Sequence, residues 1–373
     1  MILRIYVFNK KVPKKAYFLV LLPIAILLSL VLSSVPGVVE RLYSNAFYRW
    51  VSQPISLVTG VFPFSVAEML LMGLVLFTLW RIAAAIIKIR KQKAEKGKAV
   101  FRFILYALTL FSVVYFGFVA VWGLNYHREP FSQIAGLDVQ PASLEELVKV
   151  CEDILQSANS LRSKVSEDEN GYMKFPGGYR TISAQASKGY EKAAEIYPQL
   201  GGHYGKPKPV LLSRAMSMTG IWGVYFPFTA EANVNVAIPD SMKPSTTCHE
   251  MAHQRGFARE DEANYIATLT CSLNPSLEFQ YSGALLSLIH ITNAIYAHDS
   301  NEYKRLYEKF GEGVKRDWYQ IDVFNRSTEG VVSDISNKIN DTYLKANMQT
   351  QGVYSYGRMV DLLIAEYRKK SEG

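Results

Sequence analysis

The sequence predicts an α+β protein, mostly helical, in which three N-terminal transmembrane helices precede an extracytoplasmic globular domain. Three long apolar stretches lie in the first third of the chain, and basic residues gather beside them. The remaining residues show helical periodicity with a few short segments typical of strands. A chain of 373 residues is long enough for a membrane region followed by one large domain.

The membrane region is predicted to cover residues 1–126, with transmembrane helices at about 16–39, 66–87 and 103–126. Each stretch is close to the ~20 residues that cross a bilayer as an α-helix. The first and third contain no charged residue, whereas the second contains Arg81, which could reach the nearer interface or face neighbouring helices. A cleaved signal peptide is the alternative for the first stretch, but its apolar run exceeds the usual ~7–15 residues.

The distribution of charge predicts the orientation. Residues 1–124 hold 15 of the 41 basic residues and three of the 33 acidic residues, whereas the remainder has 26 basic and 30 acidic residues. Lysine and arginine are concentrated in the N-terminal tail and in the loop 88–102, which places both in the cytoplasm and everything after Tyr126 outside. We therefore expect a multi-pass protein of the cell membrane. A neighbouring lipid bilayer explains the basic loop, so nucleic acid is not an expected partner.

Residues 127–373 are predicted to form the extracytoplasmic domain. Ser143 is the expected N-cap of its first helix, with Glu146 three residues later. Helical periodicity continues over much of the domain, in residues 142–165, 182–198, 278–298, 301–320 and 357–370. A short strand is predicted within 206–213 and two strands, bent near Pro227, within 220–240. The three cysteines form no C-x-x-C pair and are expected to be buried or unpaired thiols: Cys151, Cys248 and Cys271.

The segment STTCHEMAHQRGFAREDEANYIA, from Ser245 to Ala267, contains the H-E-x-x-H spacing at His249, Glu250 and His253. Residues four apart lie on one face of a helix, so the two imidazoles point to a common position. A catalytic Zn²⁺ ion held by two imidazoles needs a third protein ligand and a water molecule. Glu250 cannot easily bind the same ion, but it can take a proton from that water as the general base.

The residues around the motif decide between a zinc site and a structural helix. Thr247 and Glu250 also fit a capping box, which would leave barely two helical turns before Gly256. A helix that begins near Pro244 is more natural. Gly256 is expected to end this helix in the left-handed conformation and to return the chain toward the metal. Three acidic residues follow that turn: Glu260, Asp261 and Glu262.

The sequence EDEAN resembles the Glu-x-x-x-Asp element of gluzincin peptidases. This resemblance implies that Glu260 is the third zinc ligand and that Asn264, one helical turn later, supports a ligand histidine. Asparagine replaces the usual aspartate, so this support would be neutral. Glu262 is the rival ligand, because the element can be read in either register. The metzincin pattern fits less well, since Arg259 stands where its last histidine should be.

The whole chain resembles a family of bacterial membrane proteins described as domain of unknown function 3810. The resemblance rests on the three amino-terminal spans and on the segments WGLNYHREPF, TCHEMAHQRGFAREDEANYIA and YLKANMQTQGVYSYGRMVDLLIAEY. It covers nearly all of the length. It implies a membrane-tethered, zincin-like domain and supplies no substrate.

Two further segments are candidates for substrate contact. Residues 232–238, ANVNVAI, come before the motif in the order in which zincins place an edge strand beside the metal, although a core strand is an equal alternative. Aromatic residues in a stretch such as GVYSYGR more often pack in the protein core than take part in catalysis. Three side chains of this stretch are nevertheless candidates to stabilise an oxyanion: Tyr354, Tyr356 and Arg358. His290 and His298 are interpreted as structural or exposed.

These observations predict a membrane-anchored zinc metallopeptidase that hydrolyses a peptide or protein substrate outside the cytoplasm, with Glu250 as the general base. One alternative is a non-catalytic zinc-binding scaffold or sensor at the cell envelope. Another is a zinc amidase that acts on the cell wall. An intramembrane protease is disfavoured, because the segments PDSMKPSTT and QRGFAREDE on either side of the motif are too polar for a bilayer interior.

Overall fold

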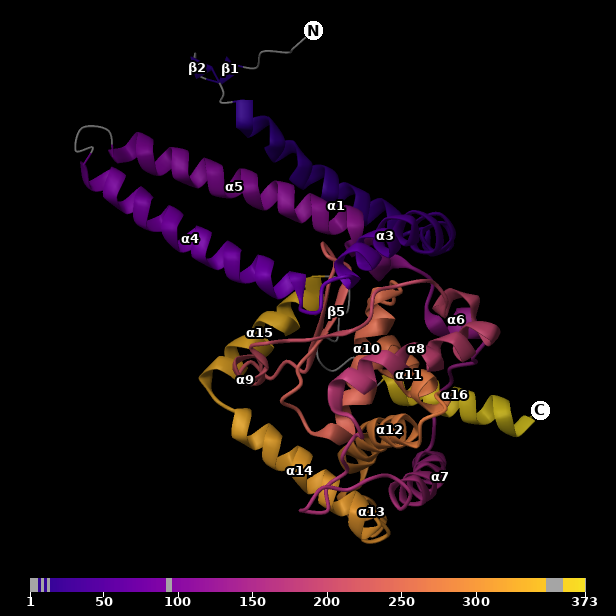
Figure 1. The fold of residues 1–373 in the computed structure, drawn as a ribbon. Coiled ribbons are helices and arrows are strands. Elements are labelled where there is room, and N and C mark those ends of the chain that lie inside the picture. The colour runs from indigo at the N-terminus through magenta and orange to yellow at the C-terminus, as the bar shows by residue number, and fades with distance from the viewer. Residues whose placement is uncertain (1–5, 8–9, 12–13, 92–95, 347–357, 373) are drawn as a thin grey trace.

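The computed structural model describes residues 6–7, 10–11, 14–91, 96–346 and 358–372. Most of these residues are helical, and the described strands form two small sheets. Long apolar helices extend to one side of the molecule, and a helical domain surrounds the larger of the two sheets on the other side (Figure 1). The smaller sheet is an antiparallel pair of short strands, β1 (Tyr6–Val7) and β2 (Lys10–Lys11).

Two described helices are long and apolar enough to cross a membrane, α4 (Val66–Lys91) and α5 (Lys96–Val121). The structure differs from the prediction for the first transmembrane span. The helical run η1 (Lys14–Val20) and α1 (Leu21–Leu32) ends before residue 39, and the chain then bends by 105°. It counts as a third span only together with the helical segment beyond the bend.

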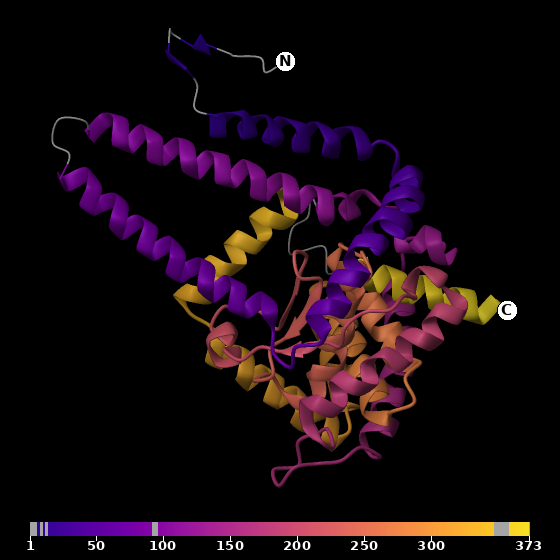
Figure 2. The ribbon, with the colours of Figure 1, turned by 45° about the horizontal axis from the view of Figure 1, so that its top comes forward.

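Pro36 explains the bend, since proline lacks the N–H that would continue the hydrogen bonding of α1 and instead opens a new helix. This helical segment consists of α2 (Pro36–Val38), the π-helical η2 (Val39–Phe47) and α3 (Tyr48–Gly60). Figures 1 and 2 show the chain turning sharply at the end of α1 and crossing the domain to the start of α4. We call residues 36–60 the crossing segment.

The domain is built from helices that share one large apolar core. In chain order, the helical segments after α5 are η4 (Gly123–His127), α6 (Phe131–Ala135), α7 (Leu144–Arg162), α8 (Gly178–Ile196), η5 (Pro198–Leu200), α9 (Ser213–Ser217), η6 (Asp240–Met242), α10 (Lys243–Gln254), α11 (Glu260–Ser272), α12 (Leu277–His298), α13 (Ser300–Glu308), α14 (Glu312–Thr328), α15 (Val331–Ala346) and α16 (Arg358–Glu372). Helices α10, α11 and α12 pack on one another at the centre, and α7 and α8 cover them.

The larger sheet has three strands, β3 (Lys208–Pro209), β4 (Gly223–Phe226) and β5 (Glu231–Val234), in the order β3-β5-β4. β3 runs parallel to β5, and β4 pairs with it antiparallel. The two strands predicted within 220–240 are therefore present. Of the two alternatives for residues 232–238, the core strand holds for the part that is a strand: β3 and β4 flank β5 on both sides, and all residues of β5 are buried. The described edge strands of this sheet are β3 and β4.

Several local predictions are confirmed. The Ser143 hydroxyl accepts a hydrogen bond from the N–H of Glu146 at 3.3 Å and caps α7. Pro244 lies in the first turn of α10, and the Thr247 hydroxyl donates to the carbonyl of Lys243 inside that helix, so Thr247 does not begin it. The cysteines are free and buried. Residues 301–320 form parts of two helices, α13 and α14, where the sequence indicated only helical character.

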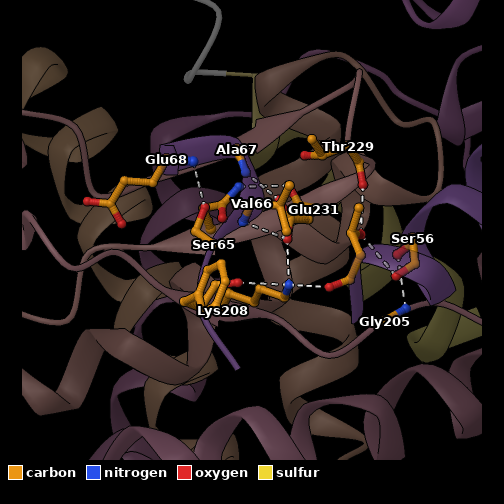
Figure 3. Close-up of polar contacts among 12 residues, drawn as sticks. Ser56, Ser65, Val66, Ala67, Glu68, Gly205, Lys208, Thr229 and Glu231 are labelled. Carbon is orange, nitrogen blue, oxygen red and sulfur yellow. Dashed lines mark hydrogen bonds and ion pairs between the residues drawn. The ribbon is translucent and has the colours of Figure 1, made fainter. Parts of the chain in front are cut away.

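The N-terminus of α4 is attached to the sheet by a buried ion pair between Glu231 of β5 and Lys208 of β3 (Figure 3). The Glu231 carboxylate also accepts hydrogen bonds from the N–H groups of Val66 and Ala67, at 3.2 and 2.7 Å. A negative charge at this position is favourable, because the first N–H groups of a helix lack intrahelical partners. The ammonium group of Lys208 further donates to the carbonyl of Thr59 at the end of α3. One ion pair thus joins the sheet, the crossing segment and α4.

Glu231→Gln should lower the free energy of unfolding by about 3–5 kcal/mol, because the charge of Lys208 would remain buried without a counter-charge. Chemical denaturation of the purified full chain in detergent micelles measures this change. The matched control adds Lys208→Met, which removes the uncompensated charge and should recover a large part of the loss. Equal stability of Glu231→Gln and the unaltered chain would contradict this account.

Candidate metal centre

His249, Glu250 and His253 lie on α10, and the turn after this helix reverses the chain. Gly256 has φ +85°, in the left-handed region that favours glycine. A Cβ atom there would lie 3.0 Å from both the Tyr48 ring and the Asn125 side chain. Glycine therefore satisfies both the backbone conformation and the close packing. The reversal brings α11 back alongside α10, and Glu260 stands at its first position.

The structure brings His249, His253 and Glu260 together. The two Nε2 atoms are 3.0 Å apart, and the Glu260 carboxylate oxygens lie 3.2 Å from His249 Nε2 and 3.7 Å from His253 Nε2. Donor atoms that surround a tetrahedral zinc ion at ~2.0–2.1 Å are separated by about 3.3–3.4 Å. Two imidazole nitrogens and one carboxylate oxygen at these separations can hold a metal ion.

The other ring nitrogen of each histidine has a hydrogen-bond acceptor. His249 Nδ1 lies 2.8 Å from Oδ1 of Asn264, and His253 Nδ1 lies 2.7 Å from the carbonyl oxygen of Phe257. A carbonyl oxygen can only accept, so Nδ1 of His253 carries the proton in the neutral ring. Each Nε2 is then left with its lone pair directed at the cluster. Such outer contacts fix the orientation of imidazole ligands in metal sites.

The electrostatics of the cluster favour a cation. Burial alone would raise the pKa of Glu260, but the charges and hydrogen bonds of His253 and His249 hold that pKa well below its usual range. Burial alone would lower the pKa of His253, but the Glu260 carboxylate outweighs this effect and raises the pKa to about 9. The three side chains therefore bind positive charge tightly, whether as a proton or as a metal ion.

Glu250 is buried next to the cluster, but it is not one of the three side chains whose possible ligand atoms lie together. Its Oε2 atom has no hydrogen-bond partner among the described residues. Burial raises the pKa of Glu250 to about 7, against the lowering effect of the two histidines and of a hydrogen bond from the Tyr225 backbone. The carboxylate packs directly on Gly223 of the edge strand β4, where a methyl group would overlap it.

Glu262, the rival ligand, is engaged elsewhere. Its Oε1 atom accepts hydrogen bonds from the N–H of Phe131 at 2.9 Å and from Arg259 at 2.7 Å. Of the two alternatives, the structure places Glu260 and not Glu262 beside the histidines.

Three aromatic side chains near the cluster were missed by the sequence analysis. The Trp122 ring meets His253 edge-on, with centroids 6.1 Å apart. The Tyr126 hydroxyl donates to the Tyr343 hydroxyl at 2.9 Å, and the Glu260 carboxylate adds to the effect of burial in raising the pKa of Tyr343. Tyr343 lies on α15, more than 80 residues after Glu260, and no spacing rule connects the two positions.

The remaining site predictions have different outcomes. Tyr354 and Tyr356 lie outside the described residues, and Arg358 begins α16 with a side chain that also lies outside them. His298 is exposed at the end of α12. For His290, on the same helix, burial, with a smaller contribution from His249, lowers the pKa to about 4.

Residues 43–364 match the protein family described as "Protein of unknown function (DUF3810)". The matched region begins in η2 and ends in α16, so it includes α4, α5, the three-stranded sheet and the complete His249, His253 and Glu260 cluster. Searches of curated proteins and of solved structures found no match. Because the match covers well over half of the chain, this protein belongs to the DUF3810 family.

Proposed function

We propose that this protein is a membrane-anchored zinc metallopeptidase. The observation that carries the proposal is the convergence of His249, His253 and Glu260 beside the buried carboxylate of Glu250, which has an oxygen without a partner among the described residues. Perturbed acidic groups of this kind gather at catalytic sites.

The donor set favours zinc over the other common divalent cations. Mg²⁺ and Ca²⁺ prefer shells of oxygen atoms, whereas two imidazoles and one carboxylate suit Zn²⁺. A zinc ion held there would supply Lewis acidity, which makes water more acidic and a peptide carbonyl more electrophilic. The hydrogen bonds from His249 to Asn264 and from His253 to Phe257 would keep both imidazoles in the orientation that binds the ion.

Glu250 is the proposed general base. Its carboxylate would take the proton of the attacking water and later return it to the nitrogen of the leaving amine. Contact with Gly223 holds the carboxylate in one place, so little ordering is needed during the reaction. Burial raises its pKa to about 7, which makes the carboxylate a stronger base than an exposed glutamate.

The Tyr343 hydroxyl is our proposed stabiliser of the carbonyl oxygen as it gains negative charge. It accepts a hydrogen bond from the hydroxyl of Tyr126, which in turn adjoins the Trp122 ring that meets His253. The roles predicted for Tyr354, Tyr356 and Arg358 stay predictions.

The proposed location of the domain is outside the cytoplasm. The support comes from the lysine and arginine residues of the N-terminal tail and of the loop between α4 and α5, which favour the cytoplasmic side. The start of η1, the end of α4 and the start of α5, which adjoin these segments, lie remote from the domain (Figure 1). The substrate would then be a peptide or protein on the opposite side of the membrane.

Glu260→Gln should remove most of the bound zinc from the purified full chain, whereas Glu262→Gln should retain it. The reason is that Glu260 contacts both histidines while Glu262 is bonded to Arg259 and Phe131. Elemental analysis after dialysis against a zinc buffer measures the content. The opposite order of zinc loss would move the ligand to Glu262, and zinc retained in both variants would exclude a ligand at either position.

Glu250→Gln should retain zinc, because it removes no ligand and keeps the shape of the side chain. Hydrolysis of a mixed peptide library should nevertheless fall by about 10²–10⁴-fold, the range assigned to a positioned acid or base. If the Glu250→Gln variant retained full zinc and cleaved peptides at the unaltered rate, the proposed mechanism would be wrong. Full zinc with no cleavage by either the variant or the unaltered chain would favour a scaffold or sensor, and cleavage of cell-wall fragments alone would favour an amidase.

Gly223→Ala should also separate zinc binding from catalysis. The added methyl group must displace the Glu250 carboxylate, and a shift of ~1 Å in a catalytic group can cost about 10²-fold in rate. Zinc content should be unchanged, since the atoms nearest to the added methyl group belong to Glu250 and not to a proposed ligand. Val224→Ala, on the exposed side of the same strand, is the matched control and should keep full peptide cleavage. Equal rates for the two variants would show that Glu250 is not held by this strand.

A further inference from the structure

The crossing segment, residues 36–60, buries several polar side chains and exposes many apolar ones. Its buried residues are mixed in polarity: Val39, Tyr43 and Tyr48 join an apolar cluster, and beside them lie Glu40 and four hydroxyl residues, Ser44, Ser52, Ser56 and Thr59. Its outer face is apolar, with Trp50 76% exposed, and the chain just beyond the segment continues this surface. The exposed apolar residues from here to the start of α4 are Leu42, Phe47, Trp50, Leu57, Val58, Val61, Phe62 and Phe64. A helix that bordered water would be expected to bury its apolar face instead.

Three of the buried hydroxyl groups make hydrogen bonds with the domain. Ser44 donates to Asn125 at 2.8 Å, Ser56 accepts from Gln254 at 2.9 Å, and Thr59 donates to the carbonyl of Thr229 at 2.9 Å. Arg49 is the one charged residue between positions 42 and 64, and it donates to the carbonyl of Gln199 in the domain. The outer face between these positions therefore carries no charge.

Close packing at small residues reinforces this attachment. Ser52, Ser56 and Gly60 follow one another at intervals of four, and a Cβ atom on Gly60 would lie 2.9 Å from the Cα atom of Gly205. Small residues at this spacing allow close backbone approach, as in helix contacts within membranes, and the Ser56 hydroxyl adds hydrogen bonds from Gly205 and Gln254. The arrangement matches a helix that has lipid on its outer side.

The direction of the segment points to the membrane surface. α1 packs along the apolar helix α5, and the crossing segment is bent from α1 by 105°. It runs from the end of α1 to the start of α4, the two places where apolar helices meet the domain (Figure 2). A helix that joins these two places at such an angle lies across the ends of the apolar helices rather than along them.

We infer that the crossing segment lies in the lipid interface on the domain side of the membrane, with its apolar face among the lipid headgroups and upper acyl chains. Continuity with the exposed apolar surfaces of α1 and α4 identifies lipid as the partner: Val35 and Val38 precede Leu42, and Met69 and Leu70 follow Phe64. The exposed Arg41 between Val38 and Leu42 is compatible with this depth, because arginine can extend its charged group to the membrane interface. Trp50 suits this depth, since tryptophan is enriched at membrane interfaces.

With the crossing segment in the lipid interface, the candidate metal centre lies next to the bilayer. The Tyr48 hydroxyl of the crossing segment donates to the carbonyl of Gln254, the residue that follows His253, and Tyr48 packs on Trp122. Trp122 directly follows α5 and meets the His253 ring edge-on. One layer of aromatic side chains therefore separates the cluster from the membrane helices. Substrates that reach the centre would be polypeptides held at the membrane surface, a consequence that rests on the proposed function.

Spin labels test the lipid contact without reference to catalysis. Cysteine is introduced singly at Leu57 and Val61 in the full chain, which is then labelled with a nitroxide and placed in lipid nanodiscs. Leu76→Cys, exposed on α4, is the lipid reference, and Tyr319→Cys, exposed on α14, is the water reference. The native cysteines are buried, and the labelled unaltered chain gives the background. Relaxation by oxygen, which partitions into lipid, is compared with relaxation by a water-soluble nickel chelate.

Labels at Leu57 and Val61 should show an oxygen-to-nickel ratio severalfold above that at Tyr319 and close to that at Leu76. A ratio equal to that at Tyr319 would overturn the inference, because the face would then border water. Low access to both reagents would also overturn it, since the face would be covered by a second copy or another protein. Either result leaves the zinc and peptide measurements unaffected, so failure of this inference and failure of the proposed function are distinguishable.

Discussion

The reversal of the chain at Gly256 is the constraint on which the candidate site depends. The left-handed backbone at this position lets α11 return along α10, and only then does Glu260 reach His249 and His253. The same glycine leaves room for Tyr48 of the crossing segment. One small residue therefore permits both the assembly of the cluster and the docking of the crossing segment on the domain.

Buried ion pairs connect the apolar helices to the domain at two places. Glu231 and Lys208 hold the start of α4 to the sheet. Glu40 of η2 receives two hydrogen bonds from Arg128, at 2.8 and 2.7 Å, and Arg128 stacks on Phe257, whose carbonyl accepts from His253. Ion pairs in this setting favour one arrangement of the parts, because separation of the partners leaves an unpaired buried charge.

The cluster and Glu250 differ in the charge that their surroundings favour. His253 and Glu260 stabilise each other as a cation and an anion, so a positive charge is retained between them. Glu250, one residue from His249, is surrounded by buried groups and by the backbone of β4, and burial weakens its carboxylate form. Adjacent acidic groups with opposite pKa shifts can perform different roles, one binding a cation and the other exchanging protons.

The sequence alone determined the features that depend on local spacing: the apolar stretches, the helix that carries the H-E-x-x-H residues, the turn at Gly256 and the nearby acidic candidates. Contacts between distant parts of the chain decided the features that residue spacing does not specify. They chose Glu260 over Glu262, because the two side chains leave α11 in different directions and only the packing of α10 shows which direction holds the histidines. Three further features also depend on contacts between residues far apart in the chain. They are the pairing of β3 with β5, the contact of Tyr343 with Tyr126, and the bend of the chain after Leu32. Periodicity records which face of an element is buried, but not the partner that covers it.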